Sequence, residues 1–147
     1  MSARKCLAPY TQFQLVIRLH HVRRLVSDWP ERYAMPAPGQ SHPRELVATL
    51  QGIAAIARQV GLSGFASVCL QVCARVSPLV DRQEELPIAV RWLLREWSAR
   101  SEMYIRHPDR MESAAAVVGE FDDSRWGQKV EQGERARLLQ ELLEPFA

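Results

Sequence analysis

Apolar residues recur three or four positions apart through most of the chain, which is the spacing that places side chains on one face of an α-helix. Five segments each show one such inward face, whereas the alternation typical of β-strands is nearly absent. The inward positions are Leu15, Leu19, Val22, Val26 and Trp29; Leu46, Leu50, Ile53, Ala57 and Val60; Phe65, Cys69, Val72, Val76 and Leu79; Val90, Leu93, Leu94, Trp97 and Tyr104; and Leu138, Leu139, Leu142 and Leu143. A further short helix, rich in Ala and Val, is predicted over about 110–120. The pattern predicts an all-α fold.

Prolines and a glycine mark where these helices are expected to end. Pro30 ends the first helix, and Gly61, which tolerates left-handed backbone geometry, ends the second. Pro78 is expected to end or bend the last turn of the third helix. The fourth helix is expected to contain Pro87 early and to break at Pro108.

The length of 147 residues is that of one domain with a hydrophobic core of its own. We expect a single helical domain over 1–147, with a first helix over 10–29, a core over 43–105 and a C-terminal helical extension over 109–147. Hydrophobic residues at 47% and charged residues at 24% are ordinary for a globular protein. The formal net charge of +2 does not demand a polyanionic partner.

The sequence shows no sign of a membrane or secreted protein. No apolar run approaches the ~20 residues of a membrane-spanning helix, and the basic N-terminus is not followed by the apolar segment of a signal peptide. Cys6, Cys69 and Cys73 form an odd set, which fits a reducing compartment better than a disulfide framework. We therefore expect no membrane span and a cytoplasmic location.

Candidate catalytic and metal-binding motifs are weak. Cys69 and Cys73 lie four apart on a predicted helix, but a structural zinc site needs four ligands and no spaced partner pair follows. We predict buried free cysteines at these two positions, no metal and no cofactor. The chain has no Ser–His–Asp order, no Gly-rich phosphate loop and no HExxH motif. We therefore expect that the protein is not an enzyme.

A basic cluster lies in the first predicted helix, at Arg18, His20, His21, Arg23 and Arg24. Such a face could meet nucleic acid or acidic lipid. We favour a solvated helix face opposite the inward positions, because the chain as a whole is nearly neutral. No nucleic-acid partner is expected.

The second helix carries a polar side chain among small ones. Residues three or four apart on a helix are neighbours, so Gln51 shares a surface with alanines and, a turn or two away, with arginines. This candidate partner-binding set is Arg44, Ala48, Gln51, Ala54, Ala55 and Arg58. Two interpretations are open: the patch docks another protein, or the small residues let a neighbouring helix approach closely.

The same segment resembles histidine phosphotransfer (HPt) domains. In that family the second helix presents a histidine, then a lysine three residues later and a small residue four later, and ends in a turn often reading Val/Phe-Gly-Leu/Phe. Counting back from the turn at 60–62 places Gln51 at the histidine, Ala54 at the lysine and Ala55 at the glycine. A second register, with Ala48 at the histidine and Gly52 at the glycine, leaves the turn three residues late. In both registers the histidine is missing.

The resemblance extends along about 46–143. The segments 85–109 and 121–143 are similar to the repeated helical modules at the N-terminal end of chemotaxis-type kinases that control type IV pili and twitching motility. They are also similar to FimL-type scaffold proteins, which carry Gln at the phosphoacceptor position. The matching cues are Leu86-Pro87, Trp92, Trp97, Tyr104, Pro108, Trp126 and the closing leucines.

The resemblance implies an HPt-like antiparallel four-helix bundle with additional C-terminal helices. A glutamine amide nitrogen shares its lone pair with the carbonyl and is not a competent nucleophile, and Ala54 removes the cation that would offset phosphoryl charge. The implied function is a pseudo-HPt adaptor or scaffold of bacterial two-component signalling, which binds a receiver domain, a histidine kinase or another signalling protein without accepting phosphate.

Two alternatives remain at this point. The chain could be a structural or oligomerisation domain, and a homodimer in particular, with Trp92, Trp97 and Trp126 at the interface. A nucleic-acid-binding protein using the basic face of the first helix is the less favoured alternative.

Overall fold

The computed structural model describes residues 7–27, 42–81, 86–122 and 130–146. Within these ranges the chain forms six α-helices and two short 3-10 helices, with no strand. The helices are α1 (Pro9–Ser27), α2 (His42–Gln59), α3 (Ser63–Asp81), α4 (Ile88–Arg106), α5 (Met111–Gly119), η1 (Glu120–Asp122), α6 (Gln132–Leu143) and η3 (Glu144–Phe146). The predicted all-α fold is confirmed. Cys6, Trp29, Pro30 and Trp126 lie outside the described residues.

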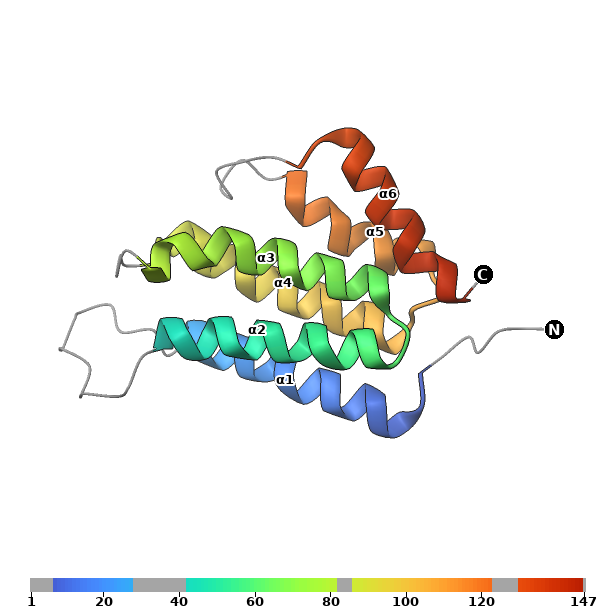
Figure 1. Ribbon diagram of the computed structural model, residues 1–147, viewed down its shortest axis with the longest axis horizontal. Coiled ribbons are helices and arrows are strands. Elements are labelled where there is room, and N and C mark those ends of the chain that lie inside the picture. Colours follow the sequence, from blue (N-terminus) through green and yellow to red (C-terminus); the bar gives the residue numbers. More distant parts are fainter. Residues whose placement is uncertain (1–6, 28–41, 82–85, 123–129, 147) are drawn as a thin grey trace.

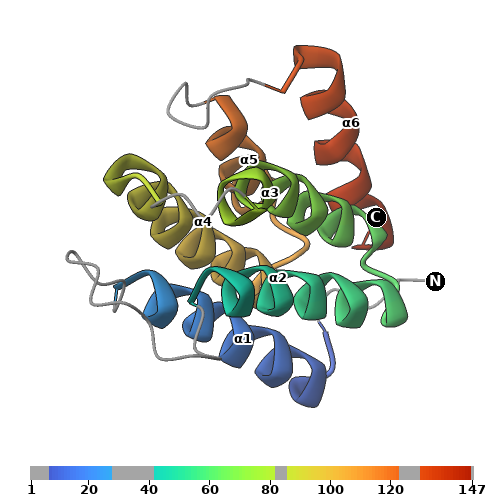
Figure 2. The same ribbon diagram turned by 60° about the vertical axis from the view of Figure 1, so that its left-hand side comes forward.

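The first four helices run alternately in opposite directions along the long axis of the molecule (Figure 1). Helix α2 packs against both α1 and α3, and α1 also packs against α4. Helices α5 and α6 cover α3 and α4 on the side away from α1 and α2, as both views show (Figures 1 and 2). The second helix therefore keeps one side free of neighbours among the helices of the described ranges.

Aromatic rings connect α3 to α4. The Phe65 ring of α3 lies 6.4 Å from the Trp97 ring and 5.5 Å from the Tyr104 ring, measured between centroids, and stacks on both. All three side chains are fully buried. Their size fills the space between α3 and α4, and such stacked pairs contribute roughly 0.5–1.5 kcal/mol each beyond the area they bury.

The inward positions predicted from the sequence form one buried cluster in the described ranges, with one clear exception. Val60, predicted to face inward, is 41% exposed. The prediction was wrong because α2 ends at Gln59, so Val60 belongs to the reversal of the chain and no longer follows the helical period. Leu79, Leu139 and Leu143 are only partly buried.

The reversal between α2 and α3 is a glycine-terminated helix end. Gly61 has a φ of 87°, which a residue with a Cβ adopts only at a cost. The Leu62 N–H donates to the Ala57 carbonyl at 2.7 Å, and the Gly61 N–H donates to the Arg58 carbonyl at 3.2 Å. This bond pair defines a Schellman motif. Leu62 is then buried, which fixes the direction in which α3 leaves the turn.

One of the two alternatives expected for Pro78 is excluded, and Pro87 lies just outside the helix that was expected to contain it. Helix α3 continues through Pro78 to Asp81, so this proline does not end the helix. Its ring removes only the bond to the Ala74 carbonyl, within the final turn. Pro87 precedes α4 as its N-cap and does not lie inside the helix. Pro108 follows the end of α4 at Arg106, as predicted.

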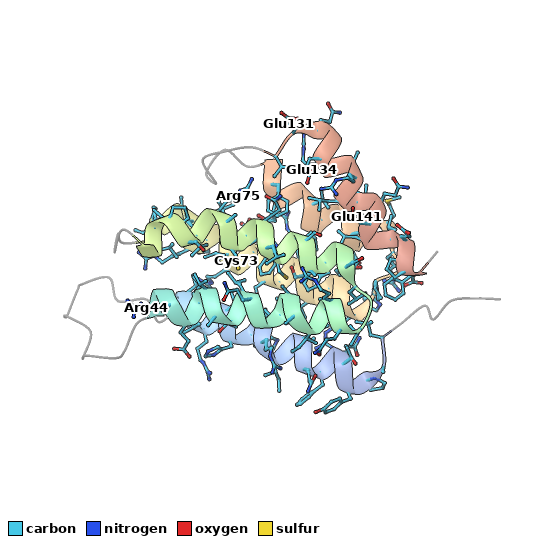
Figure 3. All side chains as sticks on the ribbon, in the orientation of Figure 1. Arg44, Cys73, Arg75, Glu131, Glu134 and Glu141 are labelled. Carbon is cyan, nitrogen blue, oxygen red and sulfur yellow. The ribbon has the colours of Figure 1, made fainter. Side chains whose placement is uncertain are left out.

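The α5–η1 segment is fixed to α3 and α4 by two arginines. Arg75 points from α3 toward this segment (Figure 3), and its guanidinium lies 5.1 Å from the centre of the Phe121 ring. Arg100 of α4 pairs with the buried Glu120 carboxylate at 3.0 Å. Burying a carboxylate costs free energy unless a cation lies beside it. The Arg100 guanidinium therefore offsets part of the cost of burying Glu120 in η1.

No helix in the described ranges combines the length and the apolar character needed to cross a lipid bilayer.

Candidate functional site

Helix α2 positions the candidate site because its fully buried apolar residues lie on one side of the helix. Leu46, Leu50, Ile53 and Ala57 are fully buried against the neighbouring helices. The opposite side of α2 faces outward, and Gln51 lies near the middle of it.

Five of the six predicted partner-binding residues share this outward face. Arg44, Ala48, Gln51, Ala55 and Arg58 are all exposed. Arg44 marks the N-terminal end of the face in Figure 3, and Arg58 lies in the last turn of the helix. We refer to these five residues as the α2 face.

Ala54 is not part of the α2 face, because only 4% of it is exposed. A position three residues after Gln51 is rotated by about 60° around the helix, whereas a position four residues after it is rotated by about 40° in the opposite direction. The first rotation carries Ala54 into the core, and the second leaves Ala55 outside. The expectation that Ala54 would lie on the accessible patch is therefore corrected.

The α2 face offers a shallow surface with cations at its two ends. Its central side chains are two methyl groups and one amide, so little protrudes between Arg44 and Arg58. An amide can donate and accept hydrogen bonds but cannot act as a nucleophile at neutral pH. The chemistry available here is recognition of a polar, acidic protein surface.

One neighbouring contact fixes α1 against α2 beside this face. The Nε2 atom of His21 lies 2.9 Å from Oε1 of Glu45, and the Arg24 guanidinium lies 3.0 Å from Nδ1 of the same ring. Arginine can only donate, so Nδ1 accepts and the proton of the neutral ring is on Nε2, from which it is donated to Glu45. His21 thus connects a cation on its own helix to a carboxylate on α2.

A second histidine bridge connects α1 to α4. Glu102 of α4 pairs with His20 at 2.7 Å, with Arg106 at 3.1 Å and with Arg23. Partial burial opposes ionisation of Glu102, but hydrogen bonds from His20, Arg106 and Arg23 outweigh it and lower the pKa of this carboxyl below its usual value. The basic cluster of α1 is therefore only partly a solvated face, since several of its members hold neighbouring helices.

The two cysteines of α3 are buried and free, as predicted. Burial, with a smaller contribution from Cys73, raises the pKa of the Cys69 thiol well above its usual value. Burial also raises the pKa of Cys73 to about 11. In the described part of the chain, no three His, Cys, Asp or Glu side chains gather in a way that could hold a metal ion.

The tryptophans separate into different environments. Trp97 is fully buried, so it is removed from the three tryptophans that the oligomerisation hypothesis offered for an interface. Trp92 is 51% exposed, with the Arg95 guanidinium 5.0 Å from its ring centre.

Helix α1 also carries an exposed apolar row, which was not among the predicted site residues. Tyr10, Phe13 and Ile17 lie three and four residues apart and are 72%, 61% and 48% exposed. The signal was present in the sequence as a second three-four series. The longer inward series on the same helix is enough to explain a helix there, so the second series adds nothing to the secondary-structure prediction.

Comparisons of the chain with protein-family models, with curated proteins and with solved structures find no match. The support for a function therefore comes from the geometry of the helices and from the residues of the α2 face.

Proposed function

We propose that the chain is a non-catalytic, HPt-like adaptor in bacterial two-component or type IV pilus chemosensory signalling. Its α2 face binds a receiver domain or another signalling protein without taking its phosphoryl group. The alternating directions of α1 to α4, with α5 and α6 added on one side, are compatible with the proposed HPt-like four-helix bundle (Figure 1).

The observation that carries this proposal is the exposure of Gln51 in the middle of α2. A glutamine packed in the core would have been a structural residue, and the patch would have lost its central polar group. Instead Gln51 is accessible, with the exposed Ala48 and Ala55 on either side along the helix. A convex partner surface can approach the α2 backbone closely at such a place, because methyl groups present no steric barrier.

The exclusion of phosphoryl transfer in this proposal follows from chemistry. Transfer to an HPt domain forms a bond from an imidazole nitrogen to phosphorus while the bond to the donor aspartate breaks. The Gln51 amide has no free lone pair on nitrogen to form that bond. Arg58 could attract an acidic receiver surface but could not replace the acceptor.

The proposal is tested by isothermal calorimetry against receiver domains from the genome that encodes the chain. Ala55→Arg places a long charged side chain at the centre of the α2 face and is expected to weaken binding at least about tenfold, or about 1.4 kcal/mol. Ala99→Arg, at an exposed alanine of α4, is the matched control and should bind like the native chain. If no receiver binds, or if the Ala55→Arg variant binds as well as native chain, the α2 face is not the docking site.

A second experiment tests the lost chemistry. Gln51→His should accept phosphate from a phosphorylated receiver that binds the native chain, as followed with radiolabel. The companion variant Ala54→Lys is unsuitable because residue 54 is buried, and a lysine there would disturb the core. Ala48→His tests the alternative register. Stable labelling of any histidine of the native chain would contradict the proposal.

An oligomerisation domain is the second candidate, favoured by one observation. Ile88 and Trp92 lie one turn apart on α4 and are 62% and 51% exposed. Sedimentation of the native chain and of Ile88→Ser combined with Trp92→Ser distinguishes the two cases. A dimer that the double variant loses supports this candidate, and a concentration-independent monomer removes it.

A further inference from the structure

Helix α1 is apolar on two opposite sides. Leu15, Leu19 and Val22 turn inward and are fully buried, as the core requires. Phe13 and Ile17 turn outward, where no other described helix covers them. Such a helix differs from an ordinary surface helix, which has one apolar stripe and one polar face.

The outward residues form a continuous line along α1. Tyr10, Phe13, Ile17, His20 and Arg24 follow one another at three- and four-residue steps, and all five are exposed. We call this line the α1 outer row. Its N-terminal half is apolar and contains two aromatic rings, and its C-terminal half is basic.

The charges around the α1 outer row are predominantly positive. Helix α1 contains three arginines and no acidic residue over its 19 residues. Two carboxylates lie nearby, and both are already engaged. Glu102 of α4 pairs with His20, Arg23 and Arg106, and Glu45 of α2 pairs with His21. The row therefore lies in a positive field that would attract a negatively charged partner.

We propose that the α1 outer row binds an acidic amphipathic helix of another protein. Tyr10, Phe13 and Ile17 match the three-four spacing of the apolar face of such a helix, and two packed helices lie about 8–10 Å apart. Carboxylates beside the partner's apolar face meet Arg24 and Arg106. Aromatic side chains with arginines near them are the residue types most enriched at binding hot spots.

The charge argues against a second copy of this chain as the occupant. A twofold axis through the row would bring Arg24 and the other α1 arginines of one copy against those of the other, with no acidic residue of α1 to offset them. The proposal is independent of the α2 face, because it rests on different residues and on a different helix.

The experiment uses two synthetic helical peptides of about 20 residues, long enough to form helix. Both carry leucines at alternating three- and four-residue spacing, with Glu at the other positions in one and Lys in the other. Fluorescence anisotropy measures the Kd of each for the full chain. The Glu peptide should bind, the Lys peptide should bind at least tenfold more weakly, and the Kd of the Glu peptide should rise with salt concentration.

Two double variants locate the binding surface. Tyr10→Ser with Phe13→Ser should weaken binding of the Glu peptide at least tenfold. The matched control, Leu70→Ser with Met111→Ser, removes two exposed apolar side chains from α3 and α5 and should leave the Kd within twofold. All four substitutions are at exposed positions, and circular dichroism with a thermal melt verifies that both variants fold like the native chain.

Four results would overturn the proposal. The Glu peptide could fail to bind, or could bind the α1 double variant as tightly as the native chain. The native chain could instead bind anionic phosphatidylglycerol vesicles through the row, which would make the partner a lipid surface. It could also form a dimer that the α1 double variant loses, which would make the partner a second copy.

Discussion

The hydroxyl of Tyr104 in α4 donates a hydrogen bond of 2.6 Å to the backbone carbonyl of Leu142 in α6. Both residues are fully buried. The carbonyls in the last turn of a helix have no partner within the helix, so this bond satisfies a group that would otherwise be buried without one. The last helix is thereby fixed to the end of the helical core.

Removing this hydroxyl should destabilise the protein measurably. Tyr104→Phe leaves the buried Leu142 carbonyl without this donor, at an expected cost of about 1–3 kcal/mol in the free energy of unfolding. Urea denaturation followed by circular dichroism measures the change. Tyr10→Phe is the control, because the Tyr10 side chain is exposed. This substitution should change the free energy of unfolding by less than about 0.5 kcal/mol. Equal effects of the two variants would show that the Tyr104–Leu142 bond contributes nothing specific.

Gly64 allows the backbone of α6 to approach the start of α3. A Cβ at this position would lie 2.6 Å from the Glu141 carbonyl carbon and 2.8 Å from the Leu142 nitrogen, distances that backbone atoms do not tolerate. Gly64→Ala should therefore lower the free energy of unfolding by about 1–3 kcal/mol or displace α6. Gly52→Ala in α2 is the matched control, since a Cβ there meets nothing within 4 Å. That substitution should stabilise the protein by roughly 0.5–1 kcal/mol.

The bridge between α1 and α4 should make stability depend on pH in the acid range. The pKa of Glu102 is lowered in the folded protein, so its contribution is complete above the unfolded-state value of about 4.3 and is lost as the pH falls through the folded pKa. Glu102→Gln should cost on the order of 1 kcal/mol at pH 7 and progressively less below about pH 4.3. Urea midpoints at several pH values check this, with Glu96→Gln at an exposed carboxylate of α4 as control. A constant difference between native chain and Glu102→Gln down to pH 3 would contradict the assignment.

The thiols of Cys69 and Cys73 in α3 should react with a labelling reagent only when the protein unfolds. Burial raises the pKa of Cys73 to about 11, so at pH 7 almost no thiolate is present to attack a labelling reagent. In a Cys6→Ser background, Ellman's reagent should titrate two thiols in urea and none rapidly in buffer. Fast labelling of either thiol in buffer would show that α3 is accessible to solvent.

The helices and most of the core could be predicted from the sequence, because both follow from local periodicity. Leu15, Leu50, Val72 and Leu93 were assigned inward from their spacing alone, and all four are fully buried. Gly61 could also be recognised, because a positive φ at a helix end is a local requirement that glycine meets best.

The relationships that decide the candidate site depend on distant parts of the chain. The difference between Ala54 and Ala55 is an exception, because Ala54 lies four residues after Leu50 and three before Ala57, so the helical period already places it beside the inward positions. His20 and Glu102 are 82 residues apart, so no local pattern could have paired them. Tyr10 and Phe13 were visible as a second helical series, but only the packed structure shows that no described helix covers them.

The contacts at Gly64 and Tyr104 also impose an order on biosynthesis. The partners of these two residues are at positions 141 and 142. The surface of α3 and α4 that α6 covers therefore stays in contact with water until residues 141 and 142 have left the ribosome exit tunnel. A nascent chain arrested before this point would leave the backbone at Gly64 uncovered and the Tyr104 hydroxyl without the Leu142 carbonyl as its acceptor.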